Sequence, residues 1–179
     1  ERKPLFGLRV LVTRAKGQSN QLSARLREAG AYPVEFPTIK IVPLEEYGEL
    51  DRAIERLSQP PGYDWLIFTS TNGVEFFWER LYELGKDARD LKGIKIAAIG
   101  PATASSLERH GLRADVVPPE YRAEGLLAAL GDVGGCRILI PRAESGREVL
   151  PQELCKAGAE VEVVAAYRTV QPTSDAEEL

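Results

Sequence analysis

Polar residues that could bind an anion follow several short apolar runs in this sequence. They are Arg14 and Arg142, the run Thr69, Ser70, Thr71 and Asn72, and the pair Gly100 and Thr103. Most stand just before a helical pattern, and the free amides at a helix start attract negative charge. An arginine can grip a carboxylate through two parallel hydrogen bonds. These residues therefore predict a site for an anionic small molecule.

Each of these residues also has an ordinary structural explanation. The side chains of residues 70–72 precede a predicted helix, where capping would stabilise the fold by about 1 kcal/mol. Capping and anion binding can coexist at one helix start. Glu144 and Glu148 lie close to Arg142 in the sequence, so an ion pair competes with ligand binding there. Thr103, taken alone, is an ordinary threonine in the first turn of a helix.

The elements that must position these residues alternate along the chain. Apolar runs rich in valine and isoleucine alternate with helical patterns, which indicates a parallel α/β protein. We predict strands at 9–13, 32–36, 65–69, 94–99, 114–117, 137–140 and 161–167. We predict helices at 18–29, 46–57, 73–84, 102–110, 124–130 and 148–157. In open parallel sheets ligands bind at the carboxyl ends of strands, which is where the anion-binding candidates lie.

Composition narrows the classes of function. The chain has 179 residues, and 44% are hydrophobic, as in ordinary globular proteins. No apolar run approaches the roughly 20 residues of a membrane span. The net charge of -4 argues against nucleic-acid binding, although local arginines can attract a small anion. His110, Cys136 and Cys155 fit no metal or redox spacing, so we expect no metal, and buried free thiols in a reducing cytoplasm.

An internal repeat runs through the chain at a constant offset of 128 residues (137 minus 9). Nine identities fall within the 23 positions from Arg9 to Ala31, and one of them matches Arg14 to Arg142. Any two strand-helix-strand units look alike, but apolar periodicity alone would not match the arginines. If the chain is a duplication, the second copy should continue for roughly 70 residues beyond Leu179.

Four segments together resemble the uroporphyrinogen-III synthase family. They are Val12-Thr-Arg14 with the helix after it, Phe68-Thr-Ser-Thr-Asn-Gly-Val74, Ala98-Ile-Gly-Pro-Ala-Thr-Ala104, and Leu139-Ile-Pro-Arg142 leading to Val164-Ala-Ala-Tyr-Arg-Thr169. Each is weak alone, but their order and spacing are specific and cover nearly the whole chain. The resemblance implies two flavodoxin-like parallel-sheet domains joined by a two-stranded connector. The first would comprise residues 1–37 and 172–179, with its remainder missing, and the second residues 38–171.

The resemblance also implies a reaction. Enzymes of this family convert hydroxymethylbilane, a linear tetrapyrrole rich in carboxylates, to uroporphyrinogen III, with loss of water and inversion of the last pyrrole ring. No redox or group-transfer step occurs, so no cofactor is expected. The anion-binding candidates named above would bind the substrate. Tyr167, at the end of a predicted strand, would give a proton to the departing hydroxyl. The family further implies a cytoplasmic monomer without nucleic-acid or membrane partners.

Two other functions stay open from the residues alone. A non-enzymatic two-domain module that binds a tetrapyrrole-like anion would share the same site, and turnover distinguishes it from an enzyme. A receiver-like domain would need acidic residues at the strand ends. Thr69, Gly100 and Arg142 occupy those positions instead, which disfavours a receiver.

Overall fold

The computed structural model describes residues 3–15 and 19–172. The chain divides into two compact units, Glu1–Val42 with Thr169–Leu179, and Pro43–Arg168. The larger unit contains most of the strands and helices, including those that hold Ser70, Gly100 and Tyr167.

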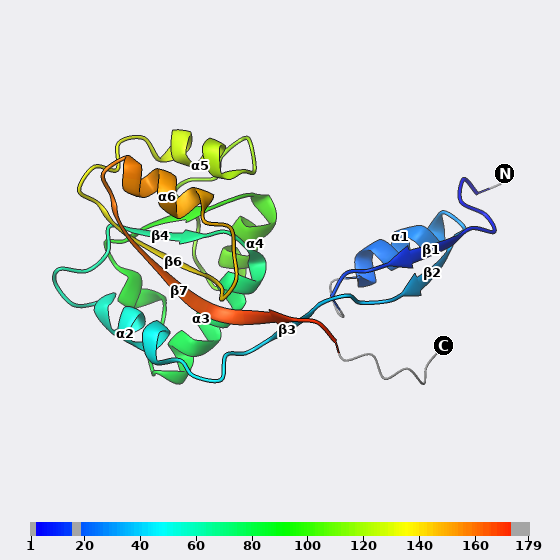
Figure 1. Cartoon of the computed structure of the whole chain (residues 1–179), viewed down its shortest axis with the longest axis horizontal. Helices are drawn as coiled ribbons and strands as arrows, with labels where there is room; N and C mark the ends of the chain where they lie inside the picture. Colours follow the sequence, from blue (N-terminus) through cyan, green and yellow to red (C-terminus); the bar gives the residue numbers. More distant parts are fainter. Residues whose placement is uncertain (1–2, 16–18, 173–179) are drawn as a thin grey trace. The chain divides into compact units, whose positions relative to one another are not determined.

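Parallel strands with helices on both faces form the larger unit (Figure 1). The sheet has the order β3-β7-β6-β4-β5. The larger unit contributes β4 (Trp65–Phe68), β5 (Lys95–Ala98), β6 (Arg137–Ala143) and most of β7 (Glu160–Val170), and β3 (Lys40–Val42) belongs to the smaller unit. Parallel pairs join β4 to β5, β4 to β6 and β6 to β7. The predicted α/β class with a parallel sheet is therefore confirmed.

Helices cover both faces of this sheet. They are α2 (Gly48–Arg56), α3 (Thr71–Glu83), α4 (Pro101–Arg109), α5 (Ala123–Leu130) and α6 (Val149–Lys156), with the short 3₁₀ helix η1 (Ala88–Leu91). Figure 1 shows α5 and α6 on one side of the strands and α2 and α3 on the other. Because both faces are covered, the strands carry continuous apolar runs, and every residue of β4 is buried.

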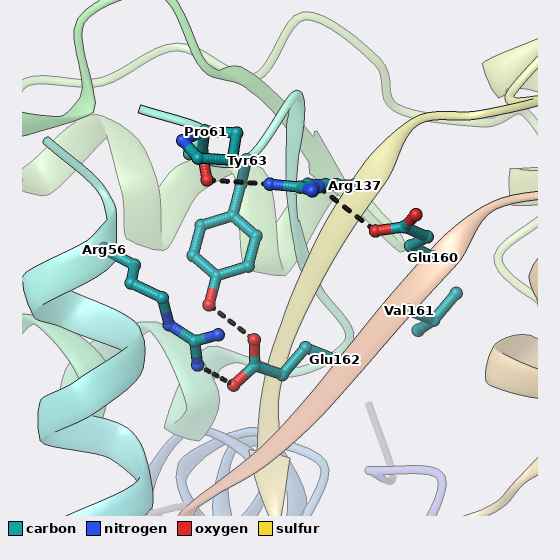
Figure 2. A pocket seen from close by; sticks show the side chains of 8 residues that line it. Arg56, Pro61, Tyr63, Arg137, Glu160, Val161 and Glu162 are labelled. Carbon is teal, nitrogen blue, oxygen red and sulfur yellow. Dashed lines mark hydrogen bonds and ion pairs between the residues drawn. The ribbon is translucent and has the colours of Figure 1, made fainter. Parts of the chain in front are cut away.

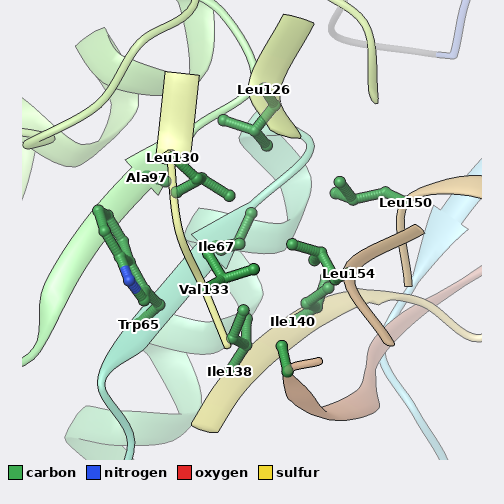
Figure 3. Close-up of a cluster of buried hydrophobic side chains, with 11 residues drawn as sticks. Trp65, Ile67, Ala97, Leu126, Leu130, Val133, Ile138, Ile140, Leu150 and Leu154 are labelled. Atoms are coloured by element: carbon green, nitrogen blue, oxygen red, sulfur yellow. The ribbon is translucent and has the colours of Figure 1, made fainter. Parts of the chain in front are cut away.

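Successive side chains of a strand point to opposite faces of the sheet, so the core has two layers. Ile67, Ile138 and Ile140 point toward α5 and α6, where they meet leucines of both helices (Figure 3). Phe68 points to the opposite face and meets Phe77 of α3, with ring centroids 5.4 Å apart. The start of α3 is thus held against the sheet by the core itself.

One predicted strand does not form, and the predicted end of another, at residue 140, is wrong. Residues 114–117 form no strand; Val116 makes only an isolated bridge to Ala97, and two prolines without amide hydrogens follow it. β6 runs on to Ala143, past the predicted end at residue 140. Pro141 is tolerated there because β4 pairs only with the earlier residues of β6, so no partner on that side requires its missing amide.

The smaller unit contains β1 (Arg9–Val12), α1 (Asn20–Glu28) and β2 (Tyr32–Glu35), with β1 and β2 paired in parallel. The sequence repeat reappears here in the hydrogen bonds. Arg9 pairs with Tyr32 exactly as their equivalents 128 residues later, Arg137 and Glu160, pair in the larger unit. The turns match as well. Gly30 and Gly158 end equivalent helices with φ of 94° and 90°, a conformation that favours glycine.

The cysteine environments differ from the expectation in part. Both thiols are free, and Cys136 is partly buried. Cys155 is exposed, so its predicted burial is wrong. The buried face of α6 is formed by Leu150 and Leu154, and Cys155 follows them onto the solvent face.

A charged cluster joins α3 to the end of α4. Glu75 of α3 accepts a hydrogen bond from Ser106 at 2.5 Å and pairs with Arg109 at 2.6 Å and His110 at 3.1 Å. Burial by itself would raise the pKa of Glu75, but the hydrogen bonds from these three residues lower it overall. The ionised carboxylate therefore stabilises the packing of α3 on α4.

We expect Leu154→Ala to lower the free energy of unfolding by about 2–5 kcal/mol, because Leu154 is fully buried and its truncation leaves a cavity. Val149 lies on the same helix but is 46% exposed, so Val149→Ala should cost less than about 1 kcal/mol. Chemical denaturation of both variants measures the difference. Equal losses would contradict the assignment of α6 to the core.

The lowered pKa of Glu75 predicts a pH dependence of stability. The stabilisation is complete above the ordinary value of 4.5 and is lost as the pH falls through the lowered folded-state pKa. Glu75→Gln should therefore reduce stability at pH 7 and flatten its decline below about pH 4.5. Denaturation curves across the acidic range test this. Glu79→Gln, an exposed position on the same helix, is the control and should keep the wild-type decline.

Candidate functional site

Ser70 connects three elements at the carboxyl end of β4. It precedes α3, and its Oγ accepts a hydrogen bond from the Gly73 amide at 2.9 Å, which confirms the predicted capping. The same Oγ lies 3.2 Å from the hydroxyl of Tyr167 on β7. The Ser70 hydroxyl thus links three elements, namely the end of β4, the start of α3 and β7.

Contacts of the ring, the hydroxyl and the backbone hold Tyr167 in place. Only 6% of its surface is exposed, and its ring stacks on Phe76 of α3 with centroids 5.4 Å apart. Its carbonyl accepts the Glu144 amide at 2.9 Å. β7 continues to Val170, so the expectation that Tyr167 ends a strand is wrong. The contacts fix the direction of its hydroxyl.

Close packing brings the start of α3 against β6. A Cβ atom added at Gly73 would lie 3.0 Å from the Pro141 carbonyl oxygen, closer than side chains normally approach. The two neighbours of Ser70, Thr69 and Thr71, are partly buried here, as is Asn72. The structure therefore brings Thr69, Ser70, Thr71 and Asn72 together with Tyr167, as one group within the larger unit.

A second group lies at the carboxyl end of β5, the strand next to β4. Gly100 precedes α4, and the Thr103 amide donates to its carbonyl at 3.1 Å. Thr103 is only 4% exposed. A Cβ atom at Gly100 would lie 3.2 Å from the ring of Tyr121, so the glycine makes room for that ring. Tyr121 is 63% exposed, which places an accessible aromatic surface at this strand end.

Sequence reasoning missed two aromatic residues of the site. Phe76, to which the sequence assigns no role in a site, stacks on Tyr167. Its helical position five residues after Thr71 gives no signal of a partner on β7. Tyr121 was not singled out, although an aromatic residue in a loop after two prolines is a detectable signal.

Arg142 lies inside β6 rather than at a helix start, which corrects the expectation for this residue. Helix α6 begins only at Val149, after an intervening loop. The Nη1 atom of Arg142 donates to the Arg147 carbonyl at 2.5 Å, and Nη2 forms an ion pair with Glu148. The Nε atom is buried without a partner among the described residues. The ion pair with Glu148, which the sequence suggested as a competitor of ligand binding, is therefore present.

Arg14 follows β1 in the smaller unit and is exposed. Within residues 3–15 and 19–172, its side chain forms no hydrogen bond or ion pair. Residues 16–18, which come next, lie outside the described residues. Arg14 thus belongs to a different unit from the other candidates.

A charged pocket of the larger unit lies at the opposite ends of the strands. Its volume is about 520 Å³, and Arg137 and Glu160 open β6 and β7 beside it. Figure 2 shows Tyr63 and Arg56 both pointing to Glu162; the Tyr63 hydroxyl donates to it at 2.7 Å. Burial, with this hydrogen bond, raises the pKa of Tyr63. The charges neutralise one another, so the pocket offers no unpaired group to an anion.

Two other features that could bear on function are a metal site and a membrane-spanning helix. Among the described residues, no group of three or more His, Cys, Asp or Glu side chains could hold a metal ion. In the same part of the chain, no helix has the length and hydropathy needed to cross a bilayer.

Ser70→Ala should lower the free energy of unfolding by about 1 kcal/mol, because the Gly73 amide loses its acceptor. Ser70→Thr keeps a capping hydroxyl and should retain most of the stability, since the backbone at this position is extended and accepts a β-branched residue. Thermal unfolding measures both variants. Identical midpoints for the two would mean that the capping bond contributes nothing.

Comparison with known proteins identifies a family. The family model described as "Uroporphyrinogen-III synthase HemD" matches residues 20–179. A uroporphyrinogen-III synthase of Synechococcus elongatus is 41% identical over 173 residues, which cover 96% of this chain and 64% of that protein. A uroporphyrinogen-III synthase of Proteus mirabilis is 30% identical over 166 residues, covering 89% of this chain and 79% of that protein.

A solved structure has the same fold. The crystal structure of a mutant uroporphyrinogen III synthase from Thermus thermophilus superposes with a TM-score of 0.71 at 22% identity, covering 93% of this chain and 64% of that one. The chain spans about two thirds of the length of such relatives, 64% for the Synechococcus elongatus protein. On its match to the family model over residues 20–179, the chain belongs to the uroporphyrinogen-III synthase family.

Proposed function

We propose that the protein acts as a uroporphyrinogen-III synthase, converting hydroxymethylbilane to uroporphyrinogen III with loss of water and inversion of the last pyrrole ring. The observation that carries this proposal is the Tyr167 hydroxyl, held 3.2 Å from Ser70 at the start of α3 in a chain of this family. A tyrosine hydroxyl beside a helix start that attracts carboxylates supports the two roles proposed here, proton donor and carboxylate-binding site.

Tyr167 would act at the first step. As the carbon–oxygen bond of the terminal hydroxymethyl group breaks, the phenolic proton passes to the leaving hydroxyl, which departs as water. The azafulvene cation that remains is attacked by the substituted carbon of the last ring. A spiro intermediate then opens and recloses with that ring inverted. The contacts of Tyr167 with Ser70 and Phe76 would hold its hydroxyl in one direction throughout.

Substrate carboxylates would bind at two neighbouring helix starts. Residues 69–72 surround the start of α3, and Gly100 and Thr103 surround the start of α4. β4 and β5 are adjacent in the sheet, so both helix starts lie at the same edge. A flexible linear tetrapyrrole held at several points would be kept curled, and such positioning can supply much of the rate.

The finer architecture is part of the same proposal. A first flavodoxin-like domain would comprise residues 1–37 and 172–179, a second would comprise residues 38–171, and two connector strands would join them. The two compact units and the neighbouring strands β3 and β7 support this division. We further propose a cytoplasmic monomer that needs no cofactor; two free thiols fit a reducing compartment.

The test supplies hydroxymethylbilane to the protein expressed from its complete gene and separates the product isomers by chromatography. We expect the isomer with the inverted ring. Tyr167→Phe should lower kcat measurably, within the ~10²–10⁴-fold that a general acid usually contributes. Tyr32→Phe, a 65% exposed tyrosine of the smaller unit, is the matched control and should keep full activity.

Two results would count against the proposal. Binding of the tetrapyrrole without formation of the inverted isomer would favour a non-enzymatic binding module. Full activity in Tyr167→Phe would leave the enzyme in place but remove Tyr167 as its proton donor.

A further inference from the structure

The repeat aligns two arginines, Arg14 and Arg142, whose surroundings differ. The two copies of the repeat agree in backbone hydrogen bonds as well as in sequence. The Tyr32 amide donates to the Leu8 carbonyl at 2.7 Å, and the equivalent Glu160 amide donates to the Cys136 carbonyl at 2.8 Å. The strands that lead to both arginines thus begin with equivalent hydrogen bonds, but the copies differ at the arginines themselves, because Arg142 lies within β6 and Arg14 follows the end of β1.

Arg142 is enclosed by the loop that follows it. Its guanidinium donates to the Arg147 carbonyl and pairs with Glu148. A Cβ atom at Gly146 would lie 3.3 Å from the guanidinium carbon, so the loop backbone packs directly against the planar group. The side chain of Arg142 is only 12% exposed. A substrate carboxylate would have to replace Glu148 and open this loop to reach it.

The acids near Arg142 have no equivalents in the sequence that follows Arg14. The position equivalent to Glu148 is Asn20 (148 minus 128), and the position equivalent to Glu144 is Lys16 (144 minus 128). An amide and a cation therefore stand where the second copy has two acids. Arg14 is exposed, and none of the described residues pairs with its side chain.

We propose that the repeat has divided the tasks of its two arginines. Arg14 binds a carboxylate of the substrate, and Arg142 holds the loop 144–148 in place before α6. The naming of the substrate rests on the proposed function; the division of tasks does not. The energetics favour it, because an exposed guanidinium can take a carboxylate in two parallel hydrogen bonds. Drawing Glu148 away would leave the enclosed guanidinium of Arg142 without its acidic partner, which is costly.

The experiment compares Arg14→Gln, Arg142→Gln and Glu148→Gln in the protein expressed from its complete gene. Uroporphyrin III, a carboxylate-rich tetrapyrrole, is the binding probe, followed by fluorescence. Limited proteolysis reports on the loop 144–148, and the KM for hydroxymethylbilane is measured where turnover occurs. Arg25→Gln, an exposed position on α1 in the same unit as Arg14, is the charge-matched control.

Arg14→Gln should weaken probe binding and raise KM by roughly 10-fold or more, without a change in the unfolding midpoint, as expected for loss of a charge-assisted contact. Arg25→Gln should bind as the wild type does. Arg142→Gln and Glu148→Gln should speed cleavage within residues 144–148 and alter binding by less than about 3-fold. Glu148→Gln keeps the arginine, so it reports on the loop even if Arg142→Gln folds poorly.

Three outcomes would overturn the inference. One is an equal loss of probe binding in Arg14→Gln and Arg25→Gln. Another is a loss of binding in Arg142→Gln that matches Arg14→Gln while the loop stays resistant to protease. The third is tighter binding in Glu148→Gln, which would make Glu148 a latch over a substrate-binding Arg142. Absence of turnover in the wild type would contradict the proposed function, whereas probe binding and cleavage would still test the division of tasks.

Discussion

Burial of the parallel strands on both faces is the constraint on which the rest of the larger unit depends. Every residue of β4 is buried, and α3 and the α5–α6 pair pack against opposite faces of the sheet. Polar side chains are therefore excluded from β4 and gather where it ends, at residues 69–72 on the carboxyl edge of the sheet. The helix starts after β4 and β5 lie at that edge, with amides that must find partners. One requirement of the fold thus creates a place where anions can bind.

The hydroxyl of Ser70 gives one of these amides its partner and also makes a second contact. It caps α3, as the helix start demands, and also contacts the hydroxyl of Tyr167. The Tyr167 ring stacks on Phe76, and the next residue of α3, Phe77, packs on Phe68 in the core. The orientation of the candidate proton donor is therefore coupled to the packing of α3. A change in the core would be transmitted to the hydroxyl through contacts of a single helix.

The repeat separates the contribution of the backbone from that of the side chains. Equivalent strands pair in the same register, and equivalent helices end at glycines with nearly equal φ. Arg14, which follows β1, and Arg142, which lies within β6, nevertheless have different neighbours. Glu148 neutralises Arg142, while the equivalent Asn20 carries no charge. A duplicated backbone can thus keep its geometry while one copy of a residue stabilises a loop and the other stays accessible.

The sequence by itself determined the α/β class, the cap at Ser70, the repeat and the family resemblance. These depend on local signals, namely apolar periodicity, capping residues and motif order, which act over a few neighbouring positions. Only the tertiary structure decided that Ser70 meets Tyr167, 97 residues away, that Phe76 stacks on that tyrosine, and that Arg142 lies within a strand. These contacts depend on which strands become neighbours and on how many residues of each strand pair. Long-range packing determines the order of the strands and the length of their pairing.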